Sequence, residues 1–109
     1  MKKTTHADLV SSVLCWLQIF RPTGYFYKTN TGGFAGEYKG KKRFVRFGVP
    51  GLADITGTLD GRTVYVECKI PPDKPKPEQL EFRRCAERAG ALYVLAYSIE
   101  DVEKVIDGA

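Results

Sequence analysis

The chain has 109 residues, a hydrophobic content of 43% and a net charge of +4. This length and composition predict one globular domain over residues 1–109 and exclude a disordered or fibrous protein. We find no secretory leader, no apolar run long enough to span a membrane, and no paired cysteine spacing typical of a zinc or redox site. We therefore expect a soluble cytoplasmic protein without a membrane or organic cofactor, and a domain this small favours a homodimer.

Positive charge is concentrated in residues 21–50. This stretch contains one acid, Glu37. Its bases are Arg21, Lys28, Lys39, Lys41, Lys42, Arg43 and Arg46. A local excess of Lys and Arg favours a nucleic-acid backbone as partner, because phosphate contacts release condensed counterions. The candidate nucleic-acid ligands are Lys28, Asn30, Lys41, Lys42, Arg43 and Arg46. A solvated, solubilising loop is the alternative interpretation.

The first predicted element in chain order is a helix over residues 7–20. Its apolar residues recur at helical spacing, and Thr5 can cap its start. The aromatic-rich residues 24–30 predict a short strand, and Thr31-Gly32-Gly33 ends any regular element there. We expect a flexible, basic loop from that point to Gly51.

Residues 51–70 contain two strand-like runs around Asp60-Gly61, a dipeptide suited to a two-residue type I′ turn. This turn sets a register in which Asp54 lies opposite Glu67. Side chains alternate along a strand, so one face of the second run is an apolar core face. Its members are Val64, Val66, Cys68 and Ile70. Glu67 and Lys69 share the other, charged face with Asp54.

The remaining elements complete an α/β pattern. Prolines make residues 71–77 a stiff connection, after which a helix over 78–89 ends at Gly90. An apolar strand over 91–97 follows, and a last amphipathic helix runs from about Ser98 to Gly108. A right-handed crossover can return the late strand parallel to the Glu67 strand, which predicts a central mixed β-sheet flanked by helices.

The opposed carboxylates are the feature that suggests chemistry. Two acids that face each other across a hairpin destabilise it unless something compensates their charge. A Mg²⁺ ion can do so, because it takes carboxylate oxygens, waters and substrate phosphates as ligands. Asp54 and Glu67 are therefore candidate ligands, together with the backbone carbonyl of Cys68. Lys69 supplies a cation that can orient an attacking water and stabilise charge on a phosphate.

A plainer interpretation competes with this one. Glu67 and Lys69 can be an exposed polar pair, with Asp54 simply starting the neighbouring strand, because polar alternation on a half-exposed sheet needs no catalytic explanation. Three features favour the metal site: the opposed position of Asp54, a core face without charge, and the basic segment just upstream.

These motifs together resemble a known nuclease family. Pro50-Gly51-Leu52-Ala53-Asp54, the Asp-Gly turn, Glu67-Cys68-Lys69, and Gln79 with Phe82 are similar to the virus-type replication-repair nuclease (VRR-NUC) domain, a branch of the PD-(D/E)xK superfamily. The resemblance continues through Ala89-Gly90-Ala91 to the end of the chain, and more weakly from Asn30-Thr31-Gly32 back to the first helix. It therefore covers nearly the whole sequence.

The resemblance implies a restriction-endonuclease-like PD-(D/E)xK fold and hydrolysis of DNA phosphodiesters with Mg²⁺, or with Mn²⁺ as a substitute. Asp54 and Glu67 would be metal ligands, Lys69 the catalytic lysine, and Gln79 an active-site helix residue. Small stand-alone members resemble Holliday-junction resolvases and act as homodimers on branched DNA. A viral or mobile-element setting in replication or repair, and the host cytoplasm as location, follow from the same resemblance.

One position departs from the family pattern, which usually has an acid early in the first helix. His6 stands there, and Asp8 would point elsewhere because two residues turn a helix by about 200°. His6 can bind the metal, directly or through water, contact a phosphate, or sit at a frayed terminus. The sequence thus predicts a metal-dependent endonuclease, and the family resemblance implies branched DNA as its substrate. The alternative is a non-catalytic nucleic-acid-binding module that uses residues 38–47.

Overall fold

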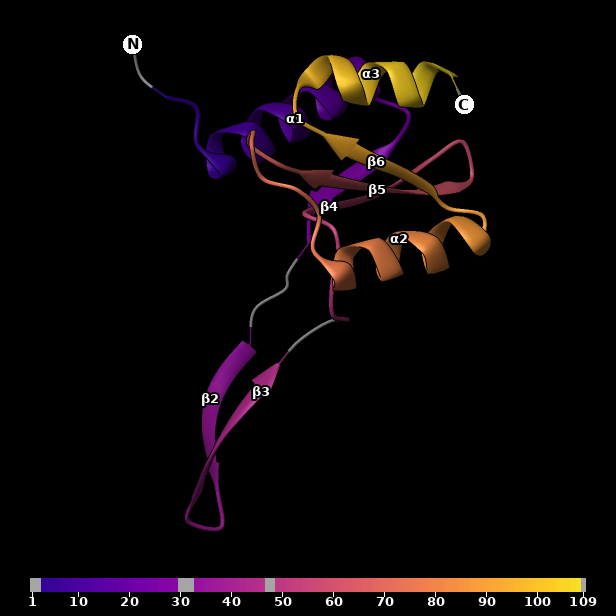
Figure 1. The fold of residues 1–109 in the computed structure, drawn as a ribbon. Helices are drawn as coiled ribbons and strands as arrows, with labels where there is room; N and C mark the ends of the chain where they lie inside the picture. The colour runs from indigo at the N-terminus through magenta and orange to yellow at the C-terminus, as the bar shows by residue number, and fades with distance from the viewer. Residues whose placement is uncertain (1–2, 30–32, 47–48, 109) are drawn as a thin grey trace.

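Four strands form a central sheet with helices on both faces in the computed structural model, which describes residues 3–29, 33–46 and 49–108 (Figure 1). The strand order is β1-β4-β5-β6, with β6 parallel to β5 and the other neighbours antiparallel. The sheet strands are β1 (Tyr25–Lys28), β4 (Ile55–Leu59), β5 (Arg62–Cys68) and β6 (Leu92–Ala96). The helices are α1 (His6–Phe20), α2 (Pro77–Arg88) and α3 (Ile99–Gly108). The predicted α/β class with a mixed sheet is confirmed.

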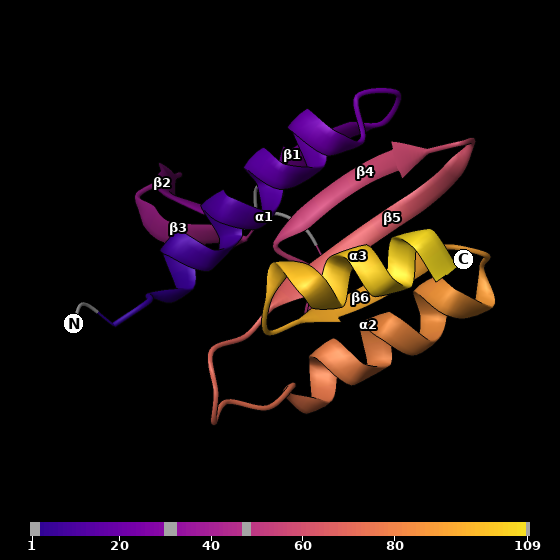
Figure 2. The ribbon, with the colours of Figure 1, turned by 90° about the horizontal axis from the view of Figure 1, so that it is seen from above.

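Helix α1 begins where its capping residues predict. The Thr5 hydroxyl accepts a hydrogen bond from the Asp8 backbone, and the Asp8 carboxylate accepts one from the Thr5 backbone. This capping box satisfies N–H groups that the first turn would otherwise leave unpaired. The buried stripe consists of Leu9, Val10, Val13 and Leu17. It packs on the sheet beside α3, as Figure 2 shows from above, and Arg21 pairs with Asp107 across the two helix ends.

The β4–β5 hairpin has the predicted turn and register. Asp60 and Gly61 both take positive φ angles, 53° and 77°, as a type I′ turn requires. Leu59 pairs with Arg62, and the register continues to Ile55 opposite Val66. Asp54 is the next residue on this side of the hairpin, one position before β4 begins.

The two faces of the sheet are covered differently. On the face of α1 and α3, the fully buried Val64, Val66 and Val102 belong to the main core. On the face of α2, Phe82 packs edge to face against Tyr65 with ring centroids 4.9 Å apart. The side of β5 that carries Glu67 is therefore covered by a helix, which contradicts the interpretation of that residue as part of an exposed polar face.

A second hairpin replaces the predicted flexible loop, so that prediction was wrong. Strands β2 (Gly33–Tyr38) and β3 (Lys41–Arg46) pair antiparallel and extend away from the main body of the protein (Figure 1). Lys39 and Gly40 form the two-residue turn, with φ angles of 50° and 74°. The sequence did not reveal it because Lys-Gly is a weaker hairpin signal than Asn-Gly or Asp-Gly. We call this hairpin, residues 33–46, the arm.

Candidate metal and active site

The candidate site lies where β5 ends, between the starts of α1 and α2. The loop before β4 supplies Asp54, whose Oδ2 atom accepts a hydrogen bond of 2.9 Å from the backbone N–H of Cys68. This bond holds the Asp54 carboxylate against the end of β5. Two residues that lie 14 positions apart in the chain are thus joined directly; the hairpin register had predicted Glu67, the neighbour of Cys68, as the residue opposite Asp54.

The first helix contributes His6. Its Nε2 atom lies 3.1 Å from Asp54 Oδ2 and 3.1 Å from the backbone oxygen of Cys68. These contacts argue against a frayed terminus, and Asp8 is engaged in the helix cap instead. Adjacent ligands of an octahedral ion with bonds of about 2.1 Å are separated by about 3 Å. His6 Nε2 therefore lies within hydrogen-bond distance of both oxygens, and a separation of 3.1 Å is also compatible with neighbouring ligands of one ion.

Glu67 is buried, with 3% of its surface exposed. Its Oε2 atom accepts a 2.6 Å hydrogen bond from Gln79 Nε2 and lies 3.8 Å from Lys69 Nζ. Its Oε1 atom is also buried and has no hydrogen-bond partner among the described residues. Burial, together with the negative charge of Asp54, raises the pKa of Glu67 to about 8. A buried carboxylate oxygen without a partner calls for a missing proton, water or ion.

Gln79 links the site to the start of α2. Its side-chain oxygen accepts a 2.8 Å hydrogen bond from the Lys76 backbone, while its nitrogen donates to Glu67. The Gln79 side-chain amide thus orients Glu67 and also accepts a hydrogen bond from the backbone at the start of α2. Lys69 is placed by its backbone N–H, which donates to Ala96 in β6 at 2.9 Å. All of the sequence-predicted catalytic residues therefore lie in this one region.

Two backbone features of the site had no role assigned from sequence. The N–H of Thr29 donates to the carbonyl of Asp54 at 2.9 Å. Gly51, with a φ of +78°, lies so close to α2 that a Cβ atom there would overlap the Glu78 carbonyl and lie 2.8 Å from the Gln79 nitrogen. Only the Pro-Gly sequence hinted at a special backbone conformation.

The predicted nucleic-acid ligands lie on β1 and on the arm. Lys28, Lys41 and Lys42 are exposed. Arg43 and Arg46 belong to strand β3, and Asn30 lies outside the described residues. The basic residues are thus separate from the buried carboxylates rather than mixed with them.

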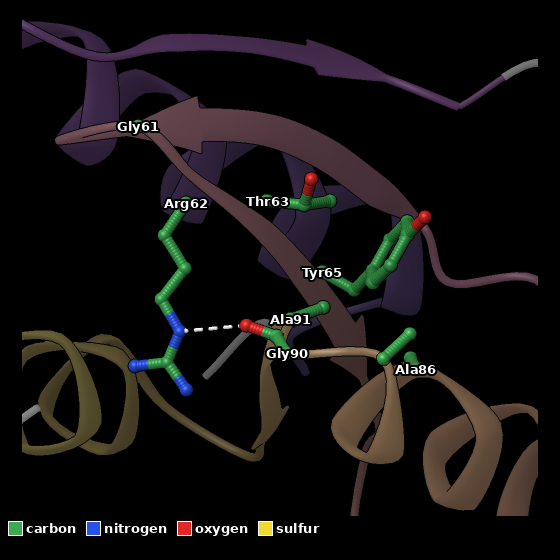
Figure 3. Close-up of a pocket in the computed structure, with 8 residues that line it drawn as sticks. Gly61, Arg62, Thr63, Tyr65, Ala86, Gly90 and Ala91 are labelled. Carbon is green, nitrogen blue, oxygen red and sulfur yellow. Dashed lines mark hydrogen bonds between the residues drawn. The ribbon is translucent and has the colours of Figure 1, made fainter.

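A cavity among the described residues lies away from the candidate site. It has a volume of about 280 Å³ and opens between the start of β5 and the end of α2, where Arg62 Nε donates to the Gly90 carbonyl at 3.0 Å (Figure 3). It is at the opposite end of β5 from Glu67. In the part of the chain that the structure describes, no group of three or more His, Cys, Asp or Glu side chains is placed to hold a metal ion. The candidate donor set relies on the Cys68 carbonyl for its third atom.

Comparisons with known proteins do not identify a family for this chain. No model of a known protein family matches the sequence, and neither does any curated protein. None of the described helices is long and apolar enough to cross a membrane. The resemblance to the VRR-NUC domain therefore rests on this chain's own residues.

Proposed function

We propose that the protein is a metal-dependent endonuclease with the PD-(D/E)xK fold that hydrolyses DNA phosphodiester bonds. One observation carries the proposal: Glu67 is buried with an unpartnered carboxylate oxygen beside Asp54. A buried acid next to a second, half-buried acid is costly unless a cation compensates their charge. A divalent ion that prefers oxygen ligands fits this donor chemistry.

Asp54, Glu67 and the Cys68 carbonyl would hold Mg²⁺, or Mn²⁺ as a substitute, with His6 at the edge of the set. Bound metal supplies Lewis-acid activation of water and offsets phosphate charge. Gln79 keeps Glu67 turned toward Asp54, because its amide is itself held by the Lys76 backbone. The Lys69 side chain is only 12% exposed, so its ammonium has little competition from solvent. It can hold the attacking water or stabilise charge that develops on the phosphate.

The basic arm and Lys28 support a nucleic acid as substrate, because exposed Lys side chains attract a phosphate backbone. Branched DNA such as a Holliday junction, a homodimeric enzyme and a host-cytoplasmic location remain part of the proposal through the family resemblance alone. The alternative, a non-catalytic nucleic-acid-binding module, would use the arm and leave the buried carboxylates as structure.

The test is cleavage of a panel of four-way junction, flap, single-stranded and duplex DNA with Mg²⁺ or Mn²⁺. Asp54→Asn should reduce cleavage at least about 100-fold, because a metal ligand is lost without a change in shape. Asp60→Asn is the matched control, since it makes the same substitution at the exposed turn of the same hairpin. It should cleave like the wild type.

Lys69→Ala should have an effect of similar size, with Lys104→Ala on the exposed side of α3 as its control. Circular dichroism and DNA binding should change little in either active-site variant. A protein that binds DNA but cuts no member of the panel would refute the nuclease and favour the binding module. Equal activity of Asp54→Asn and Asp60→Asn would also refute it.

A further inference from the structure

Described residues that flank the arm in sequence contact the candidate site on both sides. On the first side, Thr29 follows β1, and its N–H donates to the Asp54 carbonyl at 2.9 Å. The Thr29 hydroxyl also hydrogen-bonds to the Thr56 hydroxyl at 2.7 Å. Thr29, the last described residue before the arm, is therefore bound to the backbone of a proposed metal ligand.

The second contact lies against α2. Gly51 follows the arm, and its backbone packs so tightly on Glu78 and Gln79 that no side chain would fit. Gln79 in turn donates to Glu67. The two residues that flank the arm in sequence thus contact, respectively, Asp54 and the residue that orients Glu67. Both contacts are part of the framework of the site.

The arm has the length and charge for a polyanionic partner. Each strand has six residues, which at about 3.4 Å per residue gives a ribbon about 20 Å long. Its five bases, Lys39, Lys41, Lys42, Arg43 and Arg46, accompany one acid, Glu37. Lys41 and Lys42 follow the turn directly and are exposed. A two-stranded hairpin is only marginally stable by itself, so a partner that binds the ribbon would stabilise it.

We propose that the arm enters the major groove of duplex DNA and holds a duplex segment beside Asp54 and Glu67. This inference rests on the proposed nuclease function and names its substrate as DNA with a double-stranded portion. The major groove of B-form DNA is about 12 Å wide and about 8.5 Å deep, and it admits a two-stranded ribbon. The major groove of A-form RNA is too narrow for protein side chains to read, and single strands offer no groove.

Binding without cleavage tests the proposal. Fluorescence anisotropy without divalent ions would compare Lys41→Gln and Lys42→Gln with the wild type on duplex DNA, single-stranded DNA and duplex RNA of one sequence. Each variant should bind duplex DNA about fivefold more weakly at 0.1 M salt, with the slope of log affinity against log salt reduced by about 0.9, because one phosphate contact is lost. Lys104→Gln removes the same charge from α3 and should change neither quantity.

Three results would overturn the proposal: an equal loss of affinity for single-stranded DNA, duplex RNA bound as tightly through the same lysines, or an equal effect of Lys104→Gln. The result is separable from the nuclease test, because no cleavage is measured. A protein that binds duplex DNA through Lys41 and Lys42 but cuts nothing overturns the nuclease proposal. A protein that cuts DNA with full dependence on Asp54 and none on these lysines overturns the role of the arm.

Discussion

The candidate site and the arm place charge in opposite environments. At the site, Glu67 is 3% exposed and each of its neighbours is held by a hydrogen bond or a packed backbone. On the arm, Lys41 and Lys42 are exposed to solvent. Charges interact strongly where water is excluded and weakly where water and salt screen them. We expect large, all-or-none effects from changes at the site and small, salt-dependent, additive effects from changes on the arm.

A pair of glycines gives an expected difference in stability that depends on where each glycine lies. Gly51 and Gly40 both have positive φ angles, but a Cβ at Gly51 meets α2 whereas one at Gly40 meets nothing within 4 Å. Gly51→Ala should cost about 3 kcal/mol, because steric overlap adds to about 1–2 kcal/mol of backbone strain. Gly40→Ala should cost only the backbone strain, because a Cβ atom there meets nothing within 4 Å, and that cost falls within the arm. Urea unfolding measures both, and equal losses would contradict the separation of site and arm.

The next effect is a pH dependence set by Glu67. Its pKa rises from 4.5 to about 8 on folding, so the folded protein holds a proton that the unfolded chain has released. The resulting stability is complete below pH 4.5 and is lost as pH rises to about 8. The free energy of unfolding of metal-free protein should fall by about 1.4 kcal/mol per pH unit in that interval from this group.

Glu67→Gln should abolish that fall, while Glu37→Gln, an exposed acid of the arm, should leave it unchanged. Thermal unfolding of the three proteins between pH 5 and 8, without divalent ions, provides the measurement. If the unfolding free energy of Glu67→Gln fell with pH as steeply as that of the wild type, Glu67 would be ionised in the folded protein throughout pH 5 to 8.

The smallest expected effect concerns metal preference at His6. Imidazole nitrogen suits transition metals, whereas carboxylate suits Mg²⁺. His6→Asp should therefore shift the ratio of Mn²⁺ to Mg²⁺ affinity toward Mg²⁺ by about tenfold, comparable to the effect of losing a residue that supports a metal ligand. Isothermal titration gives both affinities, and Lys41→Gln serves as the control from the arm. An unchanged ratio would place His6 outside the ligand set.

Local patterns predicted most of the fold. The helical spacing after Thr5, the Asp60-Gly61 turn and the apolar run over 91–97 all act over a few residues, and each element was found within one or two residues of its expected place. The register from Leu59 opposite Arg62 to Ile55 opposite Val66 followed from the same turn, because a two-residue hairpin sets the register of every later pair. The arm was missed because its turn has no strong sequence signal.

The sequence by itself determined which residues can do chemistry: the two carboxylates, the lysine beside them and the basic stretch upstream. Only the tertiary structure decided that Glu67 is buried beneath α2, that His6 reaches Asp54 from 48 positions away, and that Thr29 and Gly51, which flank the arm in sequence, contact the site. Spacing and periodicity report neighbours along one helix or hairpin. Burial and the contacts between elements depend on how distant segments pack, and packing sets the strength of every charge in the site.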